Sequence, residues 1–542
     1  MRDPAADRAV LSEIHDEARA GRHARAAELA ESALQDGMQH PLLFNLAALQ
    51  QEQLGHLEAA ETLLRKGLTL APDDVACRNA LGLCLLRREE PAQALAEFDR
   101  LLQANSNLPF ALSSRGSALS WLGESAAAQK SFERAVELDP GQVASWTGLA
   151  GLAASRGAYA DTRAFAERAL ALAPGFPAAL IALANADYGE RHYTEAEARI
   201  REVLDRDLGA VERCHAYGLL GDVLDKLNRR AEALAAYTIC NEGLRVHYGN
   251  RYGDGPSARA YAEAIVQFFD TADKTAWQAR PESQGAEHPV AGHVFLIGFP
   301  RSGTTLLEVI LEGHPEVASL EEQELLIDSV REYMRRPADL AALQDAPAGD
   351  LERFRAAYWR RVAGCGIAVA GKTFVDKHPL NTLKLPLIAR LFPRAKILFA
   401  CRDPRDVIWS CYRHRFRMSE PIYELLTLEG AARYYDVTMA LGIRWMSQFG
   451  LDACLVRHED LVTEFAREMK RVCGFLNLTW APAMGDFALR TRDRPVLTPS
   501  TAQLVRGLNT EGVGQWRRYR EFLEPVLPLL KPWLARFYYE GS

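Results

Sequence analysis

The sequence predicts a two-part fold, an all-α repeat half followed by an α/β half with a parallel sheet. Small residues recur every 34 residues through the N-terminal half, which is typical of stacked helical hairpins. In the C-terminal half, apolar runs rich in β-branched residues alternate with helical patterns, which indicates parallel strands with helices on both faces. The length of 542 residues is sufficient for about two to four domains.

The repeat half is recognised by several registers that share one period. The turn glycines keep a spacing of 34 (55−21, 157−123, and twice 34 between 55 and 123): Gly21, Gly55, Gly123 and Gly157. Glu89 and Arg191 occupy the two positions of this register that lack glycine. Three further registers hold Ala26, Ala60, Ala94, Ala128 and Ala196 with Thr162; Pro72, Pro140 and Pro174 with Ser106; and Ala48, Gly82, Gly116, Ala150 and Ala184. A turn glycine, small residues where helices cross and a closing proline predict tetratricopeptide repeats.

A last repeat follows with a shift of three residues, at Gly221, Asn228 and Ala233. We therefore expect about seven repeats, which bury their apolar faces by stacking and form a concave groove. Such a groove typically binds a peptide or protein segment. The alternative is a scaffold or dimerisation arm without a ligand.

Three segments follow from these patterns. Residues 1–250 are expected to form the repeat solenoid, and residues 251–290 a capping helix (Ala258–Ala272) with a Pro/Gly-rich linker. Residues 291–542 are expected to form the α/β domain, and the turn-rich segment His247–Ser257 to separate it from the repeats.

The α/β half is expected to contain four strands, each followed by a helix. The expected strands are His293–Ile297, Gly371–Pro379, the start of Ala395–Asp406, and the segment that begins at Ala453. The expected helices begin at Thr304, in the acidic segment Gly313–Val330, and at Asn381, Val407, Gly430 and Thr463, with a closing helix in Pro525–Glu540. Ligands of such sheets bind beyond the carboxyl ends of the strands, where Arg301, Lys377 and Arg402 are expected.

The composition excludes several classes of function. A net charge of −7 without a long basic run argues against nucleic acid as a partner. The nine cysteines are scattered without a CxxC pair, so we expect no disulfide framework, no zinc site and a reducing compartment. No apolar run suggests a signal peptide or a membrane span. We expect a cytoplasmic protein of bacterial origin.

The loop between the first strand and its helix has the spacing of a phosphate-binding loop, with one change. Gly298, Gly303 and Thr305 fit the pattern GxxxxGK[ST], whereas Thr304 occupies the lysine position and the positive charge lies in the loop as Arg301. A loop of backbone N–H groups at a helix N-terminus binds anions. The change suits a single 5′-phosphate-like group, and it disfavours a P-loop kinase. An ordinary βα turn is the alternative.

With these residues, about 290 to 540 of the chain resembles the sulfotransferases that use 3′-phosphoadenosine 5′-phosphosulfate (PAPS). The nearest resemblance is to tyrosylprotein sulfotransferases and bacterial relatives with tetratricopeptide repeats. It implies PAPS as co-substrate without a metal, and a 5′-phosphosulfate loop formed by Pro300, Arg301, Ser302, Gly303, Thr304 and Thr305. Arg402 and Ser410, eight residues apart, match the pair that holds the 3′-phosphate. Asp403 and Arg405 are expected to form a structural ion pair instead.

The resemblance also implies the catalytic residues. Arg301 and Lys377 are the candidate cations near the bridging oxygen, and Glu322 matches the catalytic base, with Glu321 and Glu324 close enough to be confused with it. The alternative base is His378, because small-molecule sulfotransferases use a histidine near the equivalent lysine. His378 directly follows Lys377, so it is expected to point to the other side of the strand.

Near the C-terminus, Ser500 matches the serine that stabilises the transition state, and Thr501 follows it in a segment that closes over the cofactor. Gln515 stands where the family has a lysine, so we expect Arg517 or Arg518 to make that cofactor contact. A second departure is the sequence RHEDL, where relatives often have RYEDL. His458 is therefore expected to change an active-site contact.

The sequence thus predicts a PAPS-dependent sulfotransferase that modifies a hydroxyl, most readily a protein or peptide tyrosine bound by the repeats. A carbohydrate, lipid or small metabolite is the alternative acceptor. A repeat-based adaptor with a degenerate transferase half is the alternative from another class. A homodimer is compatible with the sequence.

Overall fold

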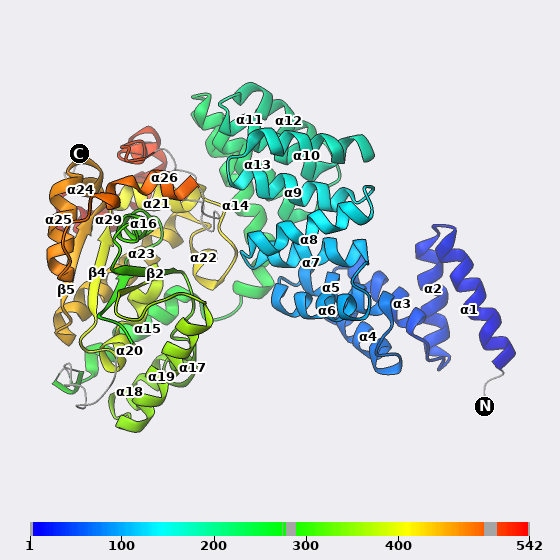
Figure 1. Cartoon of the computed structure of the whole chain (residues 1–542), viewed down its shortest axis with the longest axis horizontal. Coiled ribbons are helices and arrows are strands. Elements are labelled where there is room, and N and C mark those ends of the chain that lie inside the picture. Colours follow the sequence, from blue (N-terminus) through cyan, green and yellow to red (C-terminus); the bar gives the residue numbers. More distant parts are fainter. Residues whose placement is uncertain (1–3, 274, 278–288, 493–506, 540–542) are drawn as a thin grey trace. The chain divides into compact units, whose positions relative to one another are not determined.

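The computed structural model describes residues 4–273, 275–277, 289–492 and 507–539 (Figure 1). The chain forms two compact units, residues 1–199 and 200–542. The first unit is entirely helical, and the second contains the sheet. This arrangement confirms the predicted fold class.

The first unit consists of helical hairpins, in which consecutive helices pack on each other. Its helices are α1 (Pro4–Arg19), α2 (His23–Gln35), α3 (Pro41–Gln53), α4 (Leu57–Leu70), α5 (Val75–Arg87), α6 (Pro91–Ala104), α7 (Pro109–Trp121), α8 (Ser125–Leu138), α9 (Val143–Ser155), α10 (Tyr159–Leu172), α11 (Pro177–Gly189) and α12 (Tyr193–Leu204). Residues 200–204 of α12 are counted with the second unit.

The 34-residue period has a structural cause in the turn within each hairpin. The four register glycines have φ between 74° and 82°. Glu89 and Arg191, the residues that replace glycine in this register, adopt the same left-handed conformation, with φ of 61° and 68°. Asn228, at the shifted position of the last repeat, has φ of 63°. The turn therefore requires positive φ whether or not glycine is present.

The small residues of the other registers lie at helix crossings. The alanines of the second register, and Thr162 among them, are fully buried. A Cβ added at Gly82 would come within 2.4 Å of the Phe98 ring, and one at Gly116 within 2.6 Å of the Phe132 ring. The helices approach so closely at these positions because glycine leaves room for an aromatic ring.

The second unit has a five-stranded parallel sheet in the order β2-β3-β1-β4-β5. Its strands are β1 (Gly292–Ile297), β2 (Val317–Glu321), β3 (Thr373–Lys377), β4 (Lys396–Cys401) and β5 (Ala453–Arg457). The chain proceeds from β1 towards β2 and β3 on one side, and later to β4 and β5 on the other. The switch point of the sheet, where ligands typically bind, therefore lies between β1 and β4.

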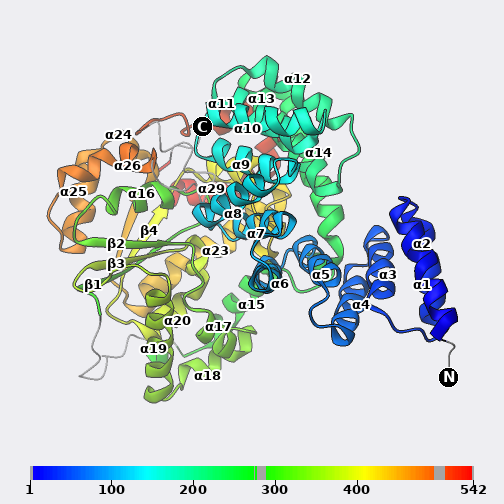
Figure 2. The same ribbon diagram turned by 45° about the vertical axis from the view of Figure 1, so that its right-hand side comes forward.

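Helices cover both faces of this sheet, as Figure 2 shows for α16 on one side and α19 and α20 on the other. The remaining helices of the unit are α13 (Ala210–Lys226), α14 (Arg230–Tyr252), α15 (Ala258–Thr271), α16 (Thr304–Leu311), α17 (Ile327–Tyr333), α18 (Leu340–Gln344), α19 (Ala348–Gly364), α20 (Leu385–Leu391), α21 (Pro404–Arg413), α22 (Glu420–Glu424), α23 (Leu428–Phe449), α24 (His458–Thr463), α25 (Phe465–Leu476), α26 (Phe487–Arg492), α28 (Arg520–Leu523) and α29 (Leu527–Arg536). Short 3₁₀ turns include η3 (Pro379–Lys384) and η5 (Gln515–Tyr519).

The structure corrects two local predictions. The acidic segment after Gly313 was expected to be a turn and a helix, but Val317–Glu321 is an edge strand paired with β3. The segment His247–Ser257 was expected to be turn-rich, but α14 continues to Tyr252. Its last turns are helical because Tyr248 is buried in a cluster with Leu426. In both cases a partner distant in sequence overrides local preference.

Two general properties bear on the class of protein. In the part of the chain that the structure describes, no helix combines the length and apolar character needed to cross a membrane. All nine cysteines are free thiols, and eight of them are buried.

The turn register makes a prediction about stability. Replacing the exposed Arg191 by glycine should stabilise the protein by about 0.5–1 kcal/mol, because a left-handed conformation strains any residue with a Cβ. Gly55→Ala is the matched control of opposite sign, since φ is +80° there and an added Cβ would meet no atom within 4 Å. Denaturant or thermal unfolding measures both. A destabilised Arg191→Gly variant would contradict the requirement for positive φ.

Candidate active site

The loop after β1 is shaped to let an anion approach the backbone. Arg301 and Gly303 have φ of 70° and 95°, and α16 begins directly after them at Thr304. A Cβ at Gly298 would lie 2.5 Å from the carbonyl oxygen of Ala400, so this position excludes any side chain. The Ser302 hydroxyl is buried and has no hydrogen-bond partner among the described residues. The loop therefore leads into the N-terminus of α16, where backbone N–H groups can bind an anion.

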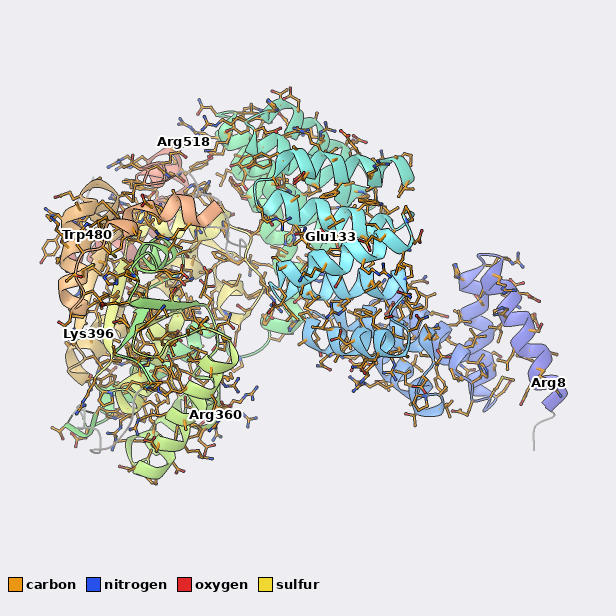
Figure 3. The ribbon with its side chains drawn as sticks, viewed as in Figure 1. Arg8, Glu133, Arg360, Lys396, Trp480 and Arg518 are labelled. Carbon is orange, nitrogen blue, oxygen red and sulfur yellow. The ribbon has the colours of Figure 1, made fainter. Side chains whose placement is uncertain are left out.

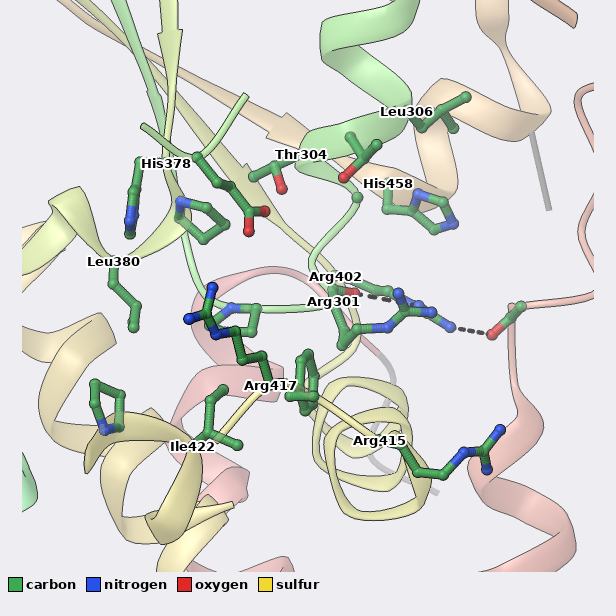
Figure 4. Close-up of a pocket in the computed structure, with 18 of the residues that line it drawn as sticks. Arg301, Thr304, Leu306, His378, Leu380, Arg402, Arg415, Arg417, Ile422 and His458 are labelled. Carbon is green, nitrogen blue, oxygen red and sulfur yellow. Dashed lines mark hydrogen bonds between the residues drawn. The ribbon is translucent and has the colours of Figure 1, made fainter. Parts of the chain in front are cut away.

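A cavity of about 600 Å³ opens beyond the carboxyl ends of the strands (Figure 4). The lining residues from the loop and α16 are Pro300, Arg301, Gly303, Thr304, Thr305 and Leu306, and those after the other strands are Glu322, Glu324, His378, Pro379, Leu380, Arg402, His458 and Val462. The remaining wall consists of Arg415, Phe416, Arg417, Ser419, Pro421 and Ile422, with Gly507, Leu508, Asn509 and Gly512. The cavity therefore collects side chains from the ends of all five strands.

Two arginines form the cationic side of this cavity. The Arg402 guanidinium donates from Nη1 to the carbonyl oxygen of Arg301 over 3.2 Å and from Nη2 to that of Gly512 (Figure 4). Its Nε is buried and has no partner in the described chain. Arg301 Nε donates to Ser410 Oγ over 3.0 Å, which brings two predicted sites together. Burial, and then the charge of Arg402, lowers the pKa of Arg301 to about 10.

Lys377 lies beside the cavity in a cage of carboxylates. Its Nζ is 2.9 Å from both Glu321 Oε1 and Glu322 Oε1 and 3.6 Å from Glu308 Oε2 on α16. The side chains of Lys377 and Glu308 are completely buried. Burial alone would lower the pKa of Lys377, but the three carboxylates outweigh it and raise the pKa above its ordinary value. Lys377 is thus a permanent cation that fixes Glu322.

Glu322 is the carboxylate of this cage that reaches the cavity. It follows the last residue of β2, has φ of 49°, and its N–H donates to the carbonyl oxygen of Lys377 over 2.7 Å. Its side chain is 44% exposed, whereas that of Glu321 is 13% exposed, and Glu321 does not line the cavity. Of these two neighbours, Glu322 is therefore the one that a ligand can contact.

Glu324 and His378 form a second pair on the same wall. His378 Nε2 lies 3.1 Å from Glu324 Oε1, and Lys384 Nζ donates to Glu324 Oε2 over 2.7 Å. The hydrogen bond to His378, together with the charge of Lys384, lowers the pKa of Glu324 to about 2. His378 Nδ1 has no partner among the described residues. Glu324 thus positions the imidazole rather than taking a proton itself.

His458 faces the phosphate loop from β5. A Cβ at Gly303 would lie 2.7 Å from His458 Nδ1, an atom that is buried without a hydrogen-bond partner in the described chain. Burial, and then the charges of Arg402 and Arg301, lowers the pKa of His458 to about 3. The imidazole is therefore neutral at physiological pH and can donate or accept a hydrogen bond.

Of the C-terminal candidates, none in the described chain lines the cavity. Ser500 and Thr501 lie outside the described residues. Arg517 packs against the Trp516 ring at 5.6 Å and does not line the cavity. Arg518, labelled in Figure 3, does not line it either, because its guanidinium pairs with Asp225 of α13 at 3.1 Å. Gln515 accepts a hydrogen bond from Arg413 over 3.0 Å.

Several cavity residues were not singled out from the sequence. Arg415, Phe416 and Arg417 follow α21 directly and form one wall. The dense basic run of residues 413–417 was the available signal, but it was interpreted as part of the helix that begins at Val407. Asp403 and Arg405 form the expected ion pair at 2.8 Å, and Asp403 caps α21.

The fold defines the class of protein, a parallel α/β domain in which the loop before α16 lies at the switch point of the sheet. The comparisons give the family. Residues 293–482 match the model described as "Sulfotransferase family", and residues 45–109 and 115–177 match that of the tetratricopeptide repeat. The chain thus joins tetratricopeptide repeats to a domain of the sulfotransferase family.

Individual relatives are distant. An uncharacterized protein of Aquifex aeolicus is 27% identical over 271 residues, 46% of this chain and 33% of that protein. A protein-tyrosine sulfotransferase of Drosophila melanogaster is 24% identical over 243 residues, 41% of this chain and 46% of that protein. Protein-tyrosine sulfotransferase 1 of Danio rerio is 25% identical over 271 residues, 46% of this chain and 72% of that protein. The chain thus spans less than half the length of the first two.

The environment of His458 predicts a pH dependence. As the pH falls below about 6.5, the unfolded histidine takes up a proton that the folded one does not, so low pH favours unfolding. Between about pH 7 and pH 5, the melting temperature of His458→Gln should therefore fall less than that of the unchanged protein. A substitution of the exposed His247 is the control and should leave the loss unchanged. An equal loss in the His458 variant would contradict a neutral, buried imidazole.

Proposed function

We propose that the protein is a PAPS-dependent sulfotransferase whose acceptor is a protein or peptide tyrosine. The observation that carries the proposal is the charge arrangement of one cavity. Arg301 and Arg402 converge with the N-terminus of α16 on one side, and Glu322 lies on the same cavity, fixed by Lys377. The free cysteines support a reducing compartment, and we propose the cytoplasm.

The donor fits the cationic side. The loop N–H groups, the Ser302 hydroxyl and Arg301 would hold the 5′-phosphosulfate, while Arg402 and Ser410 would hold the 3′-phosphate. The unpartnered Ser302 Oγ and Arg402 Nε support this fit, since buried polar groups require partners. When bound, PAPS supplies the sulfuryl group and a bisphosphate leaving group. Arg301 would stabilise the negative charge that develops between them. Lys377, which does not line the cavity, would act through Glu322.

The base is proposed to be Glu322. Its carboxylate reaches the cavity and is held by Lys377 at 2.9 Å, so it is oriented before the acceptor binds. A positioned carboxylate can take the proton of an attacking hydroxyl. The strained backbone of Glu322, with φ of 49°, supports a functional constraint at this residue.

A second candidate base is His378. It lines the same cavity, and its Nε2 lies 3.1 Å from Glu324 Oε1, which orients the ring. Its Nδ1 has no hydrogen-bond partner in the described chain. An imidazole oriented by a carboxylate is a common arrangement for a general base. Both candidates line the cavity, and mutation distinguishes them.

The relatives of the chain and its repeats support the proposed acceptor. Tyrosine is supported by the protein-tyrosine sulfotransferases among the relatives. The repeats support a protein acceptor, because repeat grooves typically bind extended chains. A carbohydrate, lipid or small metabolite, or an adaptor without activity, are the competing outcomes of the tests below.

The donor assignment is tested by thermal shift. Adenosine 3′,5′-bisphosphate should raise the melting temperature more than ATP with magnesium does, because a ligand that binds only the native state stabilises it. Arg402→Met should abolish this shift while the protein remains folded. An equal or larger shift with ATP would contradict the donor assignment.

The base assignment predicts a difference between two variants. Glu322→Gln should preserve bisphosphate binding and lower turnover by roughly two to four orders of magnitude, the usual effect of losing a general base. His378→Ala should reduce turnover less. Turnover with saturating PAPS measures both variants. An inactive His378→Ala with an active Glu322→Gln would assign the base to His378.

The role of the repeats is tested by truncation at the boundary that the structure provides. A chain starting at Asp205 retains α13, α14 and α15, which pack in the unit of the sheet. It should bind adenosine 3′,5′-bisphosphate and retain weak activity on a small phenol, but lose most kcat/KM on a protein acceptor. Bisphosphate binding is the folding control. Equal kcat/KM of the truncated and full-length chains on the protein acceptor would indicate that the first repeats are only a scaffold.

A further inference from the structure

The last repeat hairpin, α13 and α14, belongs to the compact unit that carries the cavity. It contacts the cavity wall formed by residues 415–422, which we call the acceptor wall. Arg415, Phe416, Arg417, Ser419, Pro421 and Ile422 of this wall line the cavity. In Figure 4, Ile422 and Arg417 lie toward the side that carries His378 and Leu380, away from Arg402 and His458. The part of the wall that carries Arg417 and Ile422 thus faces the space for an acceptor, whereas the Arg415 side chain extends away from it.

Helix α14 holds the segments that flank this wall. Asn241 Nδ2 donates to the carbonyl oxygen of Tyr412 over 2.8 Å in a buried contact, and Thr238 Oγ1 lies 3.1 Å from the Tyr412 hydroxyl. Beyond the wall, the Tyr423 hydroxyl donates to the carbonyl oxygen of Arg245 over 3.3 Å. Both flanks of the acceptor wall are therefore attached to one helix.

Helix α13 holds the wall itself through Arg415. Asp222 Oδ2 pairs with Arg415 Nη2 at 2.7 Å, while Asp222 Oδ1 accepts a hydrogen bond from the Tyr237 hydroxyl over 2.9 Å. Arg415 Nη1 is buried and has no hydrogen-bond partner in the described chain, so the ion pair with Asp222 is what fixes this guanidinium. Removing the carboxylate would leave a partly buried charge without its partner.

The shape of α13 is fitted to the same side chain. Gly218 lies one turn before Asp222, and a Cβ at Gly218 would come within 2.6 Å of Arg415 Cδ and 3.1 Å of Cγ. Glycine in a helix interior costs about 0.5–1 kcal/mol relative to alanine. Its presence here makes room for the stem of Arg415 against the helix.

We propose that α13 is a positioning element of the acceptor site, in which Gly218 and Asp222 fix Arg415 and thereby the acceptor wall. The inference rests on the proposed sulfotransferase function and assigns part of acceptor binding to the last repeat. The phosphate loop, Arg301 and Arg402 are not contacted by Gly218 or Asp222 in the described chain. A change at these two residues therefore alters acceptor binding and leaves donor binding intact.

The test uses full-length Gly218→Ala, which displaces Arg415 without changing charge. The matched control is Gly249→Ala in α14, where an added Cβ would meet no atom within 4 Å. The acceptor probe is a random copolymer of glutamate and tyrosine, and donor affinity is measured calorimetrically with adenosine 3′,5′-bisphosphate. Gly218→Ala should raise the copolymer KM roughly tenfold, the scale expected for a displaced binding group, with kcat and bisphosphate Kd nearly unchanged. Gly249→Ala should change none of them.

Asp222→Asn gives an independent test of the same contact. The asparagine oxygen can still accept the Tyr237 hydrogen bond, but its NH₂ group faces the Arg415 guanidinium, so KM should rise as in Gly218→Ala. Tyr237→Phe removes the other hydrogen bond of Asp222 and should leave KM unchanged. An unchanged KM in Gly218→Ala, or the same rise in either control, would overturn the inference alone. Failure of the unchanged protein to bind the bisphosphate or to modify the copolymer would overturn the proposed function, and the inference with it.

Discussion

The site depends on the concentration of positive charge at the carboxyl end of β1 and β4. Arg402 is held by the carbonyl oxygens of Arg301 and Gly512, and Arg301 by the Ser410 hydroxyl, next to the N-terminus of α16. Neutral oxygens orient these guanidinium groups without cancelling their charge. Burial of the Arg301 guanidinium, and then repulsion by the Arg402 charge, lowers the pKa of Arg301. A dianionic ligand would offset the repulsion and the cost of burying the guanidinium, because its charge would be opposite and its oxygens would accept hydrogen bonds.

The carboxylate cage of Lys377 has the complementary design. Glu308, Glu321 and Glu322 surround one buried ammonium group, and only Glu322 of these lines the cavity. The cationic and anionic groups thus face the same space from different strands. A hydroxyl placed between them would have a proton acceptor on one side and an electrophile held by cations on the other.

The sequence was informative where the physical signal is local. The repeat period follows from turns that need positive φ and from crossings that need small residues, and both are properties of single positions. The loop between β1 and α16 is similarly contained in a few consecutive residues. The strand β2 was missed because its residues favour a helix locally, and it is stabilised by pairing with β3, which is distant in sequence.

Long-range ion pairs were equally beyond the sequence. Arg518 could have been a cofactor ligand by its position near Trp516, but Asp225, nearly 300 residues earlier, pairs with it instead. Arg415 is attached to Asp222 in the same way. Such partners depend on how the last repeat hairpin packs within the unit of the sheet, and no spacing in the chain encodes this packing. The connection between repeats and site was therefore visible only in the structure.

The most direct test of the proposed reaction is transfer of label from radiolabelled PAPS to the tyrosine copolymer by the full-length protein. We expect labelled tyrosine sulfate and stoichiometric adenosine 3′,5′-bisphosphate, with the rate of both lowered by roughly two to four orders of magnitude in Glu322→Gln. Label found in carbohydrate, lipid or a small metabolite of a cell extract, with none in tyrosine, would contradict the proposed acceptor. The absence of any transfer from PAPS to copolymer or extract would contradict the proposed reaction.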